Sequence, residues 1–424
     1  MHRSSSRTRP LTSDGRSAGS FTTCFTRTSV AAAPAVAAML ACAPLASCDH
    51  ATGPRQATVR QRWYATQPGH SQSRPAIAGD VVYVGTGDGQ VVARDRRSGA
   101  ARWATYVSGG PVDGANLVAR GGVVVAVATY ETVGLDAATG AQLWRFAAPP
   151  DPGVSVGPGG LVQGVRLDAD DATVYVPAWG ASVSAVDLRT GRARWSWTPG
   201  VAPTDTAAAG GPFRSGAEGV RVSGDTVFAG VWHNVDRLGY RSEEWIVALD
   251  RATGAELWRV SLPVYTSAVA VDGAPALAGN LVLLGTIGGH VWAVDRTSRQ
   301  LVWHFATTPH LATISEPEVA DGVVYRDGGD AQLYAIRASD GTVLWKSAAV
   351  GQVGNDVLVT AGRVYATNSV QLFVLDRRSG RLVATVNQPH PPARTGGVIS
   401  APAAAEGGQV VSVMTGGVLS FDEP

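Results

Sequence analysis

Short runs of alternating apolar and polar residues recur along most of the chain, and they come in pairs joined by a compact polar turn. The first three paired runs read VVARDRRSGAARW, TVGLDAATGAQLW and VSAVDLRTGRARW, at 91–103, 132–144 and 183–195. A period of two is typical of half-buried β-strands. Four more copies are IVALDRATGAELW (246–258), VWAVDRTSRQLVW (291–303), LYAIRASDGTVLW (333–345) and LFVLDRRSGRLVA (372–384). The pattern therefore predicts a repeated antiparallel hairpin.

The turn of each hairpin carries an anchor residue, followed by Ser or Thr and, in most copies, Gly. The anchors are Asp95, Asp136, Asp187, Asp250, Asp295, Arg337 and Asp376. Asp and Thr side chains accept from and donate to nearby backbone groups, and Gly supplies the left-handed residue of such a turn. A Trp follows most anchors at an offset of eight, as Trp103, Trp144, Trp195, Trp258, Trp303 and Trp345, whereas Ala384 breaks the series. These Asp and Trp residues are interpreted as structural, with each indole packing on a neighbouring unit.

Two further strands are predicted upstream of each hairpin, as in RPAIAGDVVYVGTGDGQVVARD at 74–95. Four strands in about 40 to 50 residues are typical of a β-propeller blade. The chain ends on VLSFDEP, a third strand without a fourth, and Val59–Ala65 resembles an outer strand that lacks its hairpin. The sequence thus predicts an all-β fold, a single eight-bladed propeller of four-stranded antiparallel blades over 59–424. Its N-terminal strand would close the C-terminal blade.

Composition narrows the class of partner. The chain has 424 residues with 35 Lys and Arg against 34 Asp and Glu, a formal net charge of +1. Such a balance argues against nucleic-acid binding through bulk charge. Hydrophobic residues make up 45% and charged residues 16%, and 51 Gly with 24 Pro suit many turns. We expect a folded, monomeric propeller that does not bind nucleic acid.

The N-terminus is typical of a targeting segment. Arg-rich residues precede a short apolar stretch at 30–45 that contains two prolines, which favours a signal peptide over a membrane span. Its exit, Leu45-Ala46-Ser47-Cys48, resembles the lipobox of bacterial lipoproteins. The prediction is a signal peptide over 1–47, lipidation at Cys48 and a polar tether over 48–58. Ordinary cleavage with an incidental Cys48 remains the alternative.

Irregular sequence concentrates in one class of connection. In a propeller, the loops between blades and those joining the second and third strands emerge on one face. The irregular segments 148–163, 199–219, 232–243, 305–317 and 387–399 all belong to this class. Insertions on one face of a repeat protein mark a binding face. The candidate partner-binding residues, chosen because aromatic residues and Arg dominate interface energetics, are Phe213, Arg214, Trp232, His233, Tyr240, His310 and Arg394.

The A-x-D-x-x-T-G-x-x-x-W unit resembles the repeat of pyrroloquinoline-quinone (PQQ) type propellers across essentially all of 59–424. That family includes quinone-dependent dehydrogenases and the outer-membrane assembly lipoprotein BamB. Size and the lipobox make the chain more similar to BamB. This resemblance implies a non-enzymatic scaffold without a cofactor, anchored to a membrane by its lipid and facing the periplasm or the cell exterior. Its partner would be an envelope protein such as the barrel-assembly machinery.

Two other functions stay open. The resemblance to quinoproteins would imply PQQ and calcium, but those enzymes carry a Cys pair, and this chain has no Cys after Cys48. Glu316, Glu318, Asn355 and Asp356 open innermost strands and could line a central channel, although no motif assigns a catalytic, cofactor or metal role to them. A glycan-binding propeller is the third hypothesis, suggested by aromatic residues in the loops.

Overall fold

The computed structural model confirms the all-β prediction. Its propeller unit spans Pro54–Pro424. The residues it describes are 57–69, 73–112, 116–128, 131–148, 165–178, 182–200, 215–234, 242–263, 271–286, 289–307, 315–348, 350, 356–368, 371–387, 402–405, 407–414 and 416–424. Within these ranges every regular element is a strand, and no helix is long and apolar enough to cross a bilayer.

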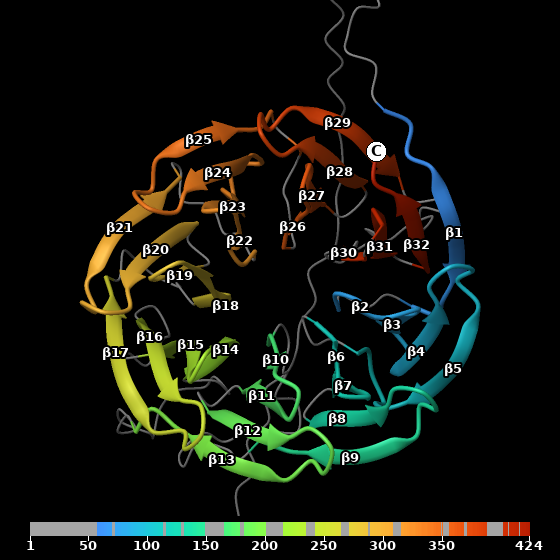
Figure 1. Cartoon of the computed structure of the whole chain (residues 1–424), viewed down its shortest axis with the longest axis horizontal. Helices are drawn as coiled ribbons and strands as arrows, with labels where there is room; N and C mark the ends of the chain where they lie inside the picture. Colours follow the sequence, from blue (N-terminus) through green and yellow to red (C-terminus); the bar gives the residue numbers. More distant parts are fainter. Residues whose placement is uncertain are drawn as a thin grey trace, which may run out of the picture. The chain divides into compact units, whose positions relative to one another are not determined.

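Eight four-stranded antiparallel sheets form a ring, with their strands in order from the axis to the rim (Figure 1). The first four blades follow the chain, each from its inner to its outer strand. Blade 1 has β2 (Ala76–Ala78), β3 (Val81–Gly85), β4 (Gln90–Asp95) and β5 (Ala101–Tyr106); blade 2 has β6 (Val118–Arg120), β7 (Val123–Ala128), β8 (Glu131–Asp136) and β9 (Gln142–Phe146); blade 3 has β10 (Asp168–Ala169), β11 (Thr173–Pro177), β12 (Val183–Asp187) and β13 (Ala193–Trp197); blade 4 has β14 (Ser215–Ser223), β15 (Thr226–Asn234), β16 (Ser242–Asp250) and β17 (Glu256–Leu262).

The other four blades complete the circle. Blade 5 has β18 (Val271–Ala278), β19 (Leu281–Thr286), β20 (His290–Asp295) and β21 (Leu301–Ala306); blade 6 has β22 (Glu318–Ala320), β23 (Val323–Asp327), β24 (Leu333–Arg337) and β25 (Val343–Lys346); blade 7 has β26 (Leu358–Val359), β27 (Arg363–Thr367), β28 (Gln371–Asp376) and β29 (Leu382–Asn387); blade 8 has β30 (Ala403–Ala405), β31 (Gln409–Met414), β32 (Gly417–Asp422) and β1 (Gln61–Thr66).

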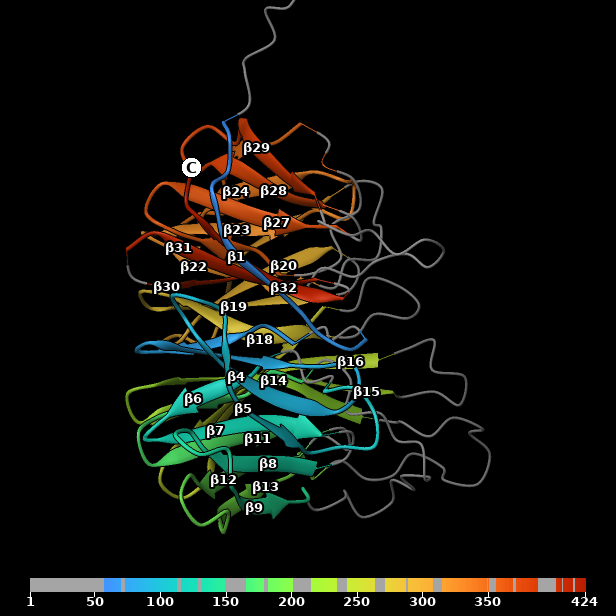
Figure 2. The same ribbon diagram turned by 90° about the vertical axis from the view of Figure 1, so that its right-hand side faces the viewer.

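Closure of the ring follows the sequence prediction. The N-terminal strand β1 pairs with β32 as the outer strand of blade 8, and the two run side by side at the rim in Figure 2. An ion pair between Arg62 and Asp422 joins these strands. Because the two chain ends share one sheet, closure removes the two long edges that an open ring would expose.

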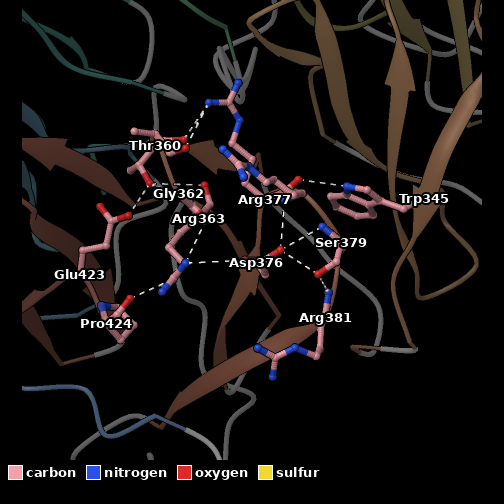
Figure 3. A network of polar contacts seen from close by, with 12 residues as sticks. Trp345, Thr360, Gly362, Arg363, Asp376, Arg377, Ser379, Arg381, Glu423 and Pro424 are labelled. Carbon is pink, nitrogen blue, oxygen red and sulfur yellow. Dashed lines mark hydrogen bonds and ion pairs between the residues drawn. The ribbon is translucent and has the colours of Figure 1, made fainter.

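The hairpin turns have the chemistry that their sequence predicts, as blade 7 shows (Figure 3). Asp376 Oδ1 accepts from the Ser379 backbone N–H at 2.9 Å and from the Ser379 hydroxyl at 2.7 Å. Gly380 adopts a φ of 68°, in the left-handed region that favours glycine. The same network holds the C-terminus, since Thr360 Oγ1 donates to Glu423 at 2.8 Å and Arg363 Nε donates to the Pro424 carbonyl at 2.8 Å.

Each repeated Trp joins its blade to the next one. The Trp345 indole of blade 6 donates to the Arg377 carbonyl in the turn of blade 7 at 3.0 Å, and its ring lies on Gly380. A Cβ added to that glycine would lie 2.4 Å from the indole. Trp103, Trp144, Trp195, Trp303 and, across the closure, Trp63 make the equivalent bond. The turn glycine therefore serves two purposes, a left-handed backbone and a socket for the neighbouring indole.

Two copies of the repeat depart from this arrangement. Ala384 takes the Trp position in blade 7, and the next blade has no hairpin turn because the chain ends lie there, so no glycine socket faces Ala384. In blade 5 the turn carries Arg299, with a φ of 60°, in place of glycine. Trp258, the repeated Trp of blade 4, packs against Phe228 with ring centroids 5.9 Å apart, which is the same contact within a blade that Trp103, Trp195 and Trp345 make with a Tyr.

The core lies between adjacent blades. One cluster joins Tyr83, Val91 and Ala93 of blade 1 to Val124 and Val133 of blade 2, all of them buried. Similar clusters of Val, Leu, Ile and Ala fill the other interfaces between blades. Because β-branched residues pack well on a pleated face, sheet-on-sheet burial around the ring fixes the innermost strands and the side chains they carry.

Candidate functional site at the propeller axis

Equivalent positions in the repeat converge on the axis. Two residues before the inner strand lie Arg74 in blade 1, Asn116 in blade 2, Arg166 in blade 3, Glu316 in blade 6 and Asp356 in blade 7. In blades 4 and 5 the residues that align with these on the short first turn are the small residues Gly219 and Ala274, which lie inside the longer inner strands β14 and β18. The ring thus carries basic or amide side chains on one side of the axis and carboxylates on the other.

Backbone bonds between neighbouring blades fix these side chains. Arg74 and Asn116 form a parallel bridge, as do Arg166 and Gly219. The Arg166 backbone N–H donates to the Glu218 carbonyl at 2.8 Å. Because the inner strands are held to one another as well as within their blades, the axial side chains project from a rigid frame.

One arginine spans the axis. Arg166 Nε lies 2.8 Å from Glu316 Oε2, and a second Arg166 nitrogen pairs with Asp356. Blades 3 and 7 lie opposite each other in the ring (Figure 1), so this ion pair bridges its full width. The backbone N–H of Glu316 donates to Asp356 Oδ1 at 2.9 Å, which ties the two acidic blades together. Arg221 approaches Glu316 to 3.9 Å.

The two acids share this arginine unequally. Burial acts to raise the pKa of Glu316, but the guanidiniums of Arg166, Arg221 and Arg74 outweigh burial and hold the pKa below its ordinary value. Burial raises the pKa of Asp356 and outweighs the attraction of Arg166. Burial also raises the pKa of Glu318. The surrounding guanidiniums therefore favour the charged form of Glu316 more than that of Asp356, as expected when neighbouring acids compete for one cation.

A cavity of about 270 Å³ lies beside this cluster, lined by Arg74, Asn116, Arg166, Arg221, Glu316 and Glu318 among others. Several of its donors and acceptors are committed: Arg74 donates to the Val357 carbonyl at 2.9 Å, and Asn116 bonds both backbone groups of Leu167 at 3.0 Å. Among the described residues no three His, Cys, Asp or Glu side chains are placed to hold a metal ion.

These residues do not fit a calcium-bound quinone. Calcium takes several free carboxylate or carbonyl oxygens, whereas the Glu316 and Asp356 oxygens already face Arg166. Asn355, the fourth channel residue considered from sequence, lies outside the described residues. The arrangement is able to hold the inner strands together electrostatically, and no catalytic step is derived from it.

The arginines of this site were missed by the sequence analysis, which singled out only its acidic half. The signal was present, because Arg74 and Arg166 occupy the same offset before the inner strand as Glu316 and Asp356. Aligning the copies on their short first turns would have found all four. That these side chains meet across the axis is decided by closure of the ring, which the repeat alone does not specify.

Of the residues predicted to bind a partner, Trp232 and His233 are described, and both are buried inside blade 4. Trp232 is 8% exposed and donates to Glu218 Oε1 at 2.7 Å. His233 is 6% exposed and stacks on Trp245, with ring centroids 6.3 Å apart. Both side chains thus contribute to the packing of the propeller, and partner binding through Trp232 and His233 stays a prediction. Lying outside the described residues are Cys48, Phe213, Arg214, Tyr240, His310 and Arg394.

Two acids, the half-buried Glu218 and the buried Glu244, flank Trp232. Burial raises the pKa of Glu218 to about 7, against the opposing hydrogen bond from Trp232. Burial also raises the pKa of Glu244, on the neighbouring strand, to about 7. Glu244 is directly paired with Trp232 in the sheet, and its Oε1 has no hydrogen-bond partner among the described residues. Blade 4 therefore contains two carboxyl groups that take up a proton at higher pH than a solvent-exposed Glu does.

Comparison with known proteins agrees with this architecture. A family model described as "Outer membrane protein assembly factor BamB" matches three overlapping stretches, 45–235, 197–320 and 288–422. The BamB of Burkholderia pseudomallei (strain K96243) is 26% identical over 387 residues, which cover 86% of this chain and 88% of that protein. The BamB of Nitrosomonas eutropha is 32% identical over 155 residues, 34% of this chain and 36% of that protein.

Dehydrogenases share the fold and part of the sequence. The dehydrogenase subunit of the quinone alcohol dehydrogenase from Acetobacter aceti is 27% identical over 210 residues, 45% of this chain and 26% of that protein. Among solved structures, BamB from Moraxella catarrhalis superimposes with a TM-score of 0.64 at 16% identity, covering 86% of this chain and all of that one. This structural likeness shows the fold alone.

Proposed function

Because the chain belongs to the family described as outer membrane protein assembly factor BamB, we propose that it is an exported, lipid-anchored scaffold that binds another envelope protein during outer-membrane protein assembly. The observation that carries the proposal is the axial ion pair. Arg166 occupies the carboxylates that a metal-dependent quinone site would need. Fold alone does not decide function, and the committed donor set favours a scaffold over a catalyst.

The proposed anchor is a lipid on Cys48, followed by a short tether to the rim. The first described residue, Ala57, lies nine positions after Cys48, and its backbone N–H donates to the Val383 carbonyl at 2.8 Å. A lipid at Cys48 would hold the side of blades 7 and 8 within the reach of a short extended segment. Metabolic labelling with a clickable fatty acid tests this, and we expect Cys48→Ala to lose the label and Cys42→Ala to keep it.

The proposed partner is a component of the barrel-assembly machinery, bound through the loops that carry Phe213, Arg214, Tyr240, His310 and Arg394. Photo-crosslinking amino acids placed at Phe213 and Arg394, in cells of the source organism, test this. A crosslinker at Thr139, an exposed turn residue of blade 2, is the matched control. Recovery of a barrel-assembly component from the loop positions and not from Thr139 is expected. Equal recovery from all three positions, or from none, would contradict the proposal.

The second candidate is a quinone-dependent dehydrogenase, favoured by the similarity to the Acetobacter aceti subunit. Titration of the purified protein with PQQ and calcium separates the two functions. Stoichiometric, calcium-dependent binding followed by the absorbance of the quinone would favour the dehydrogenase, and its absence the scaffold. Retention on a peptidoglycan or polysaccharide column would favour glycan binding instead.

A further inference from the structure

Arginines are distributed unevenly over the hairpin turns of the ring. Blade 7 exposes Arg378 and Arg381 in its turn, and blade 1 exposes Arg97. No carboxylate of the described residues forms an ion pair with any of these three side chains. Although the formal net charge of the whole chain is only +1, positive charge therefore collects where blades 7, 8 and 1 adjoin (Figure 1).

Turn arginines of blades 4 and 6 have acidic partners instead. In blade 4, Arg251 lies 3.6 Å from Asp225. In blade 6, Arg337 lies 2.9 Å from Asp340 within the same turn. Because each of these pairs is neutral as a unit, blades 4 and 6 offer a charged partner less attraction than blades 7 and 1 do.

The carboxylates beside the turns of blades 7 and 1 are already matched. Asp422, the last residue of β32, pairs with Arg62 of β1. In blade 1, Asp95 pairs with Arg102 at 2.7 Å. In blade 7, Asp376 accepts hydrogen bonds from its own turn. The exposed turn arginines are therefore in excess of the acids beside them.

One segment of the chain joins these blades into a single surface. Residues 57–63 begin on blade 7, where the Ala57 backbone N–H donates to the Val383 carbonyl at 2.8 Å. The segment then enters the outer strand of blade 8 and reaches blade 1, where the Trp63 indole donates to the Arg96 carbonyl at 2.8 Å. Both contacts lie within two residues of the exposed turn arginines.

A further arginine lies on this segment, on the blade between the two turns. The Arg60 side chain is 87% exposed and approaches Asp422 only to 3.8 Å. That carboxylate also pairs with a second arginine of the same segment, so it does not neutralise both. We call Arg60, Arg97, Arg378 and Arg381 the basic seam.

We propose that the basic seam binds anionic lipid headgroups of the membrane that the Cys48 lipid enters. The chain reaches the seam at Ala57, nine residues after Cys48, and an extended segment of that length spans at most roughly 30 Å. A lipid at this cysteine therefore keeps the four arginines near the bilayer surface. Each arginine close to an anionic surface adds attraction, which decays over a Debye length of about 8 Å at physiological ionic strength. The placement rests on the proposed lipid anchor, whereas the attraction of the seam to anionic lipid does not.

The test measures co-sedimentation of residues 54–424 with vesicles of about 30% phosphatidylglycerol in phosphatidylcholine, at about 50 mM salt. This unit is used because every strand pairing and the closure of the ring lie inside it. It also lacks the Arg-rich N-terminus and Cys48, so neither contributes to binding. The central variant is Arg378→Glu/Arg381→Glu. We expect its apparent Kd for these vesicles to be weaker by at least about tenfold.

Blade 3 supplies the matched control. Its turn exposes Arg189 and Arg192, at the same two turn positions as the substituted pair of blade 7. Arg189→Glu/Arg192→Glu changes the net charge of the protein equally, but on a blade that does not adjoin the seam (Figure 1). Its affinity should change by less than about twofold, because the substituted charges lie beyond the screening length. Matching thermal unfolding midpoints for both variants show that folded proteins are being compared.

Two further conditions separate this mode from nonspecific adhesion. Binding should be lost on vesicles of phosphatidylcholine alone and at about 0.5 M salt, because screening removes the attraction. The proposal is overturned if the unit binds neutral vesicles as tightly as anionic ones, if it binds neither, or if the two double variants weaken binding equally. Fatty-acid labelling of Cys48 reports on the anchor separately: a labelled chain whose propeller ignores vesicle charge keeps the proposed anchor and overturns the seam.

Discussion

The hairpin turns and the axial end of the propeller are built from the same repeat in opposite ways. At the turns, equivalent positions carry the same residues and make the same contacts, as the indole bonds of Trp103, Trp144 and Trp345 show. At the axis, equivalent positions carry different residues, and Arg166 pairs with Glu316 and Asp356 because they differ. Repetition therefore identifies what holds the blades together, and divergence at a repeated position identifies what is particular to this chain.

The largest expected effect lies in the repeated part. Trp144 is 6% exposed, and its indole donates to the Leu188 carbonyl at 2.9 Å. Trp144→Ala should lower the free energy of unfolding by about 3 to 5 kcal/mol, because it leaves a cavity between blades 2 and 3. Chemical denaturation measures this change. The control is Leu143→Ala, one residue away and 46% exposed, which should cost less than about 1 kcal/mol. If both variants lost the same unfolding free energy, the contact of the Trp144 indole with the next blade would not be what stabilises the ring.

The axial cluster comes next. Arg166→Met leaves two buried carboxyl groups without their cation and should cost about 3 kcal/mol of unfolding free energy. Adding Glu316→Gln and Asp356→Asn should restore most of the loss, because the uncompensated acids cause it. Arg194→Met, which breaks the exposed pair with Asp187, should cost less than about 1 kcal/mol. If the triple variant is no more stable than Arg166→Met, packing of the arginine and not its charge holds the axis.

The smallest effect depends on pH and sharpens the contrast within blade 4. Burial raises the pKa of Glu244 to about 7, above its ordinary 4.5. The folded state therefore binds the proton more tightly than the unfolded state, so Glu244 lowers stability as pH rises from about 4.5 to 7. Glu244→Gln should be more stable than the wild type by about 1 to 3 kcal/mol at pH 8 and indistinguishable from it near pH 4.

The neighbouring Glu243 supplies the control for this pH dependence. It lies on the same strand but is exposed. Glu243→Gln should leave the difference in unfolding free energy between pH 4 and pH 8 unchanged. The raised pKa would be contradicted if the unfolding free energy of the wild type, measured relative to that of Glu244→Gln, increased from pH 4 to pH 8.

The fold was almost fully predictable, and the functional surface much less so. The turn residues and the Trp spacing specify each hairpin locally, and the split blade at 59–65 and 417–422 specifies closure. By contrast, the sequence suggested Trp232 and His233 as partner-binding candidates because they lie in an irregular segment and because aromatic residues dominate interface energetics. The structure extends β15 to Asn234 and buries both side chains against blade 4. The length of a strand beyond its repeat is not encoded in the repeat.

What the sequence determined by itself is the local chemistry: alternating strands, Asp- and Gly-bearing turns, and a Trp at a fixed offset. These follow from interactions between residues close in the chain, so they can be read without coordinates. Only the tertiary structure decided that Arg166 meets Asp356 and that residues 57–63 contact blade 7 at Val383 and blade 1 at Arg96. Each of these contacts joins segments that only closure of the ring brings together. Burial then makes it energetically costly to leave their polar groups unpaired, and neither effect can be read from residues close in the chain.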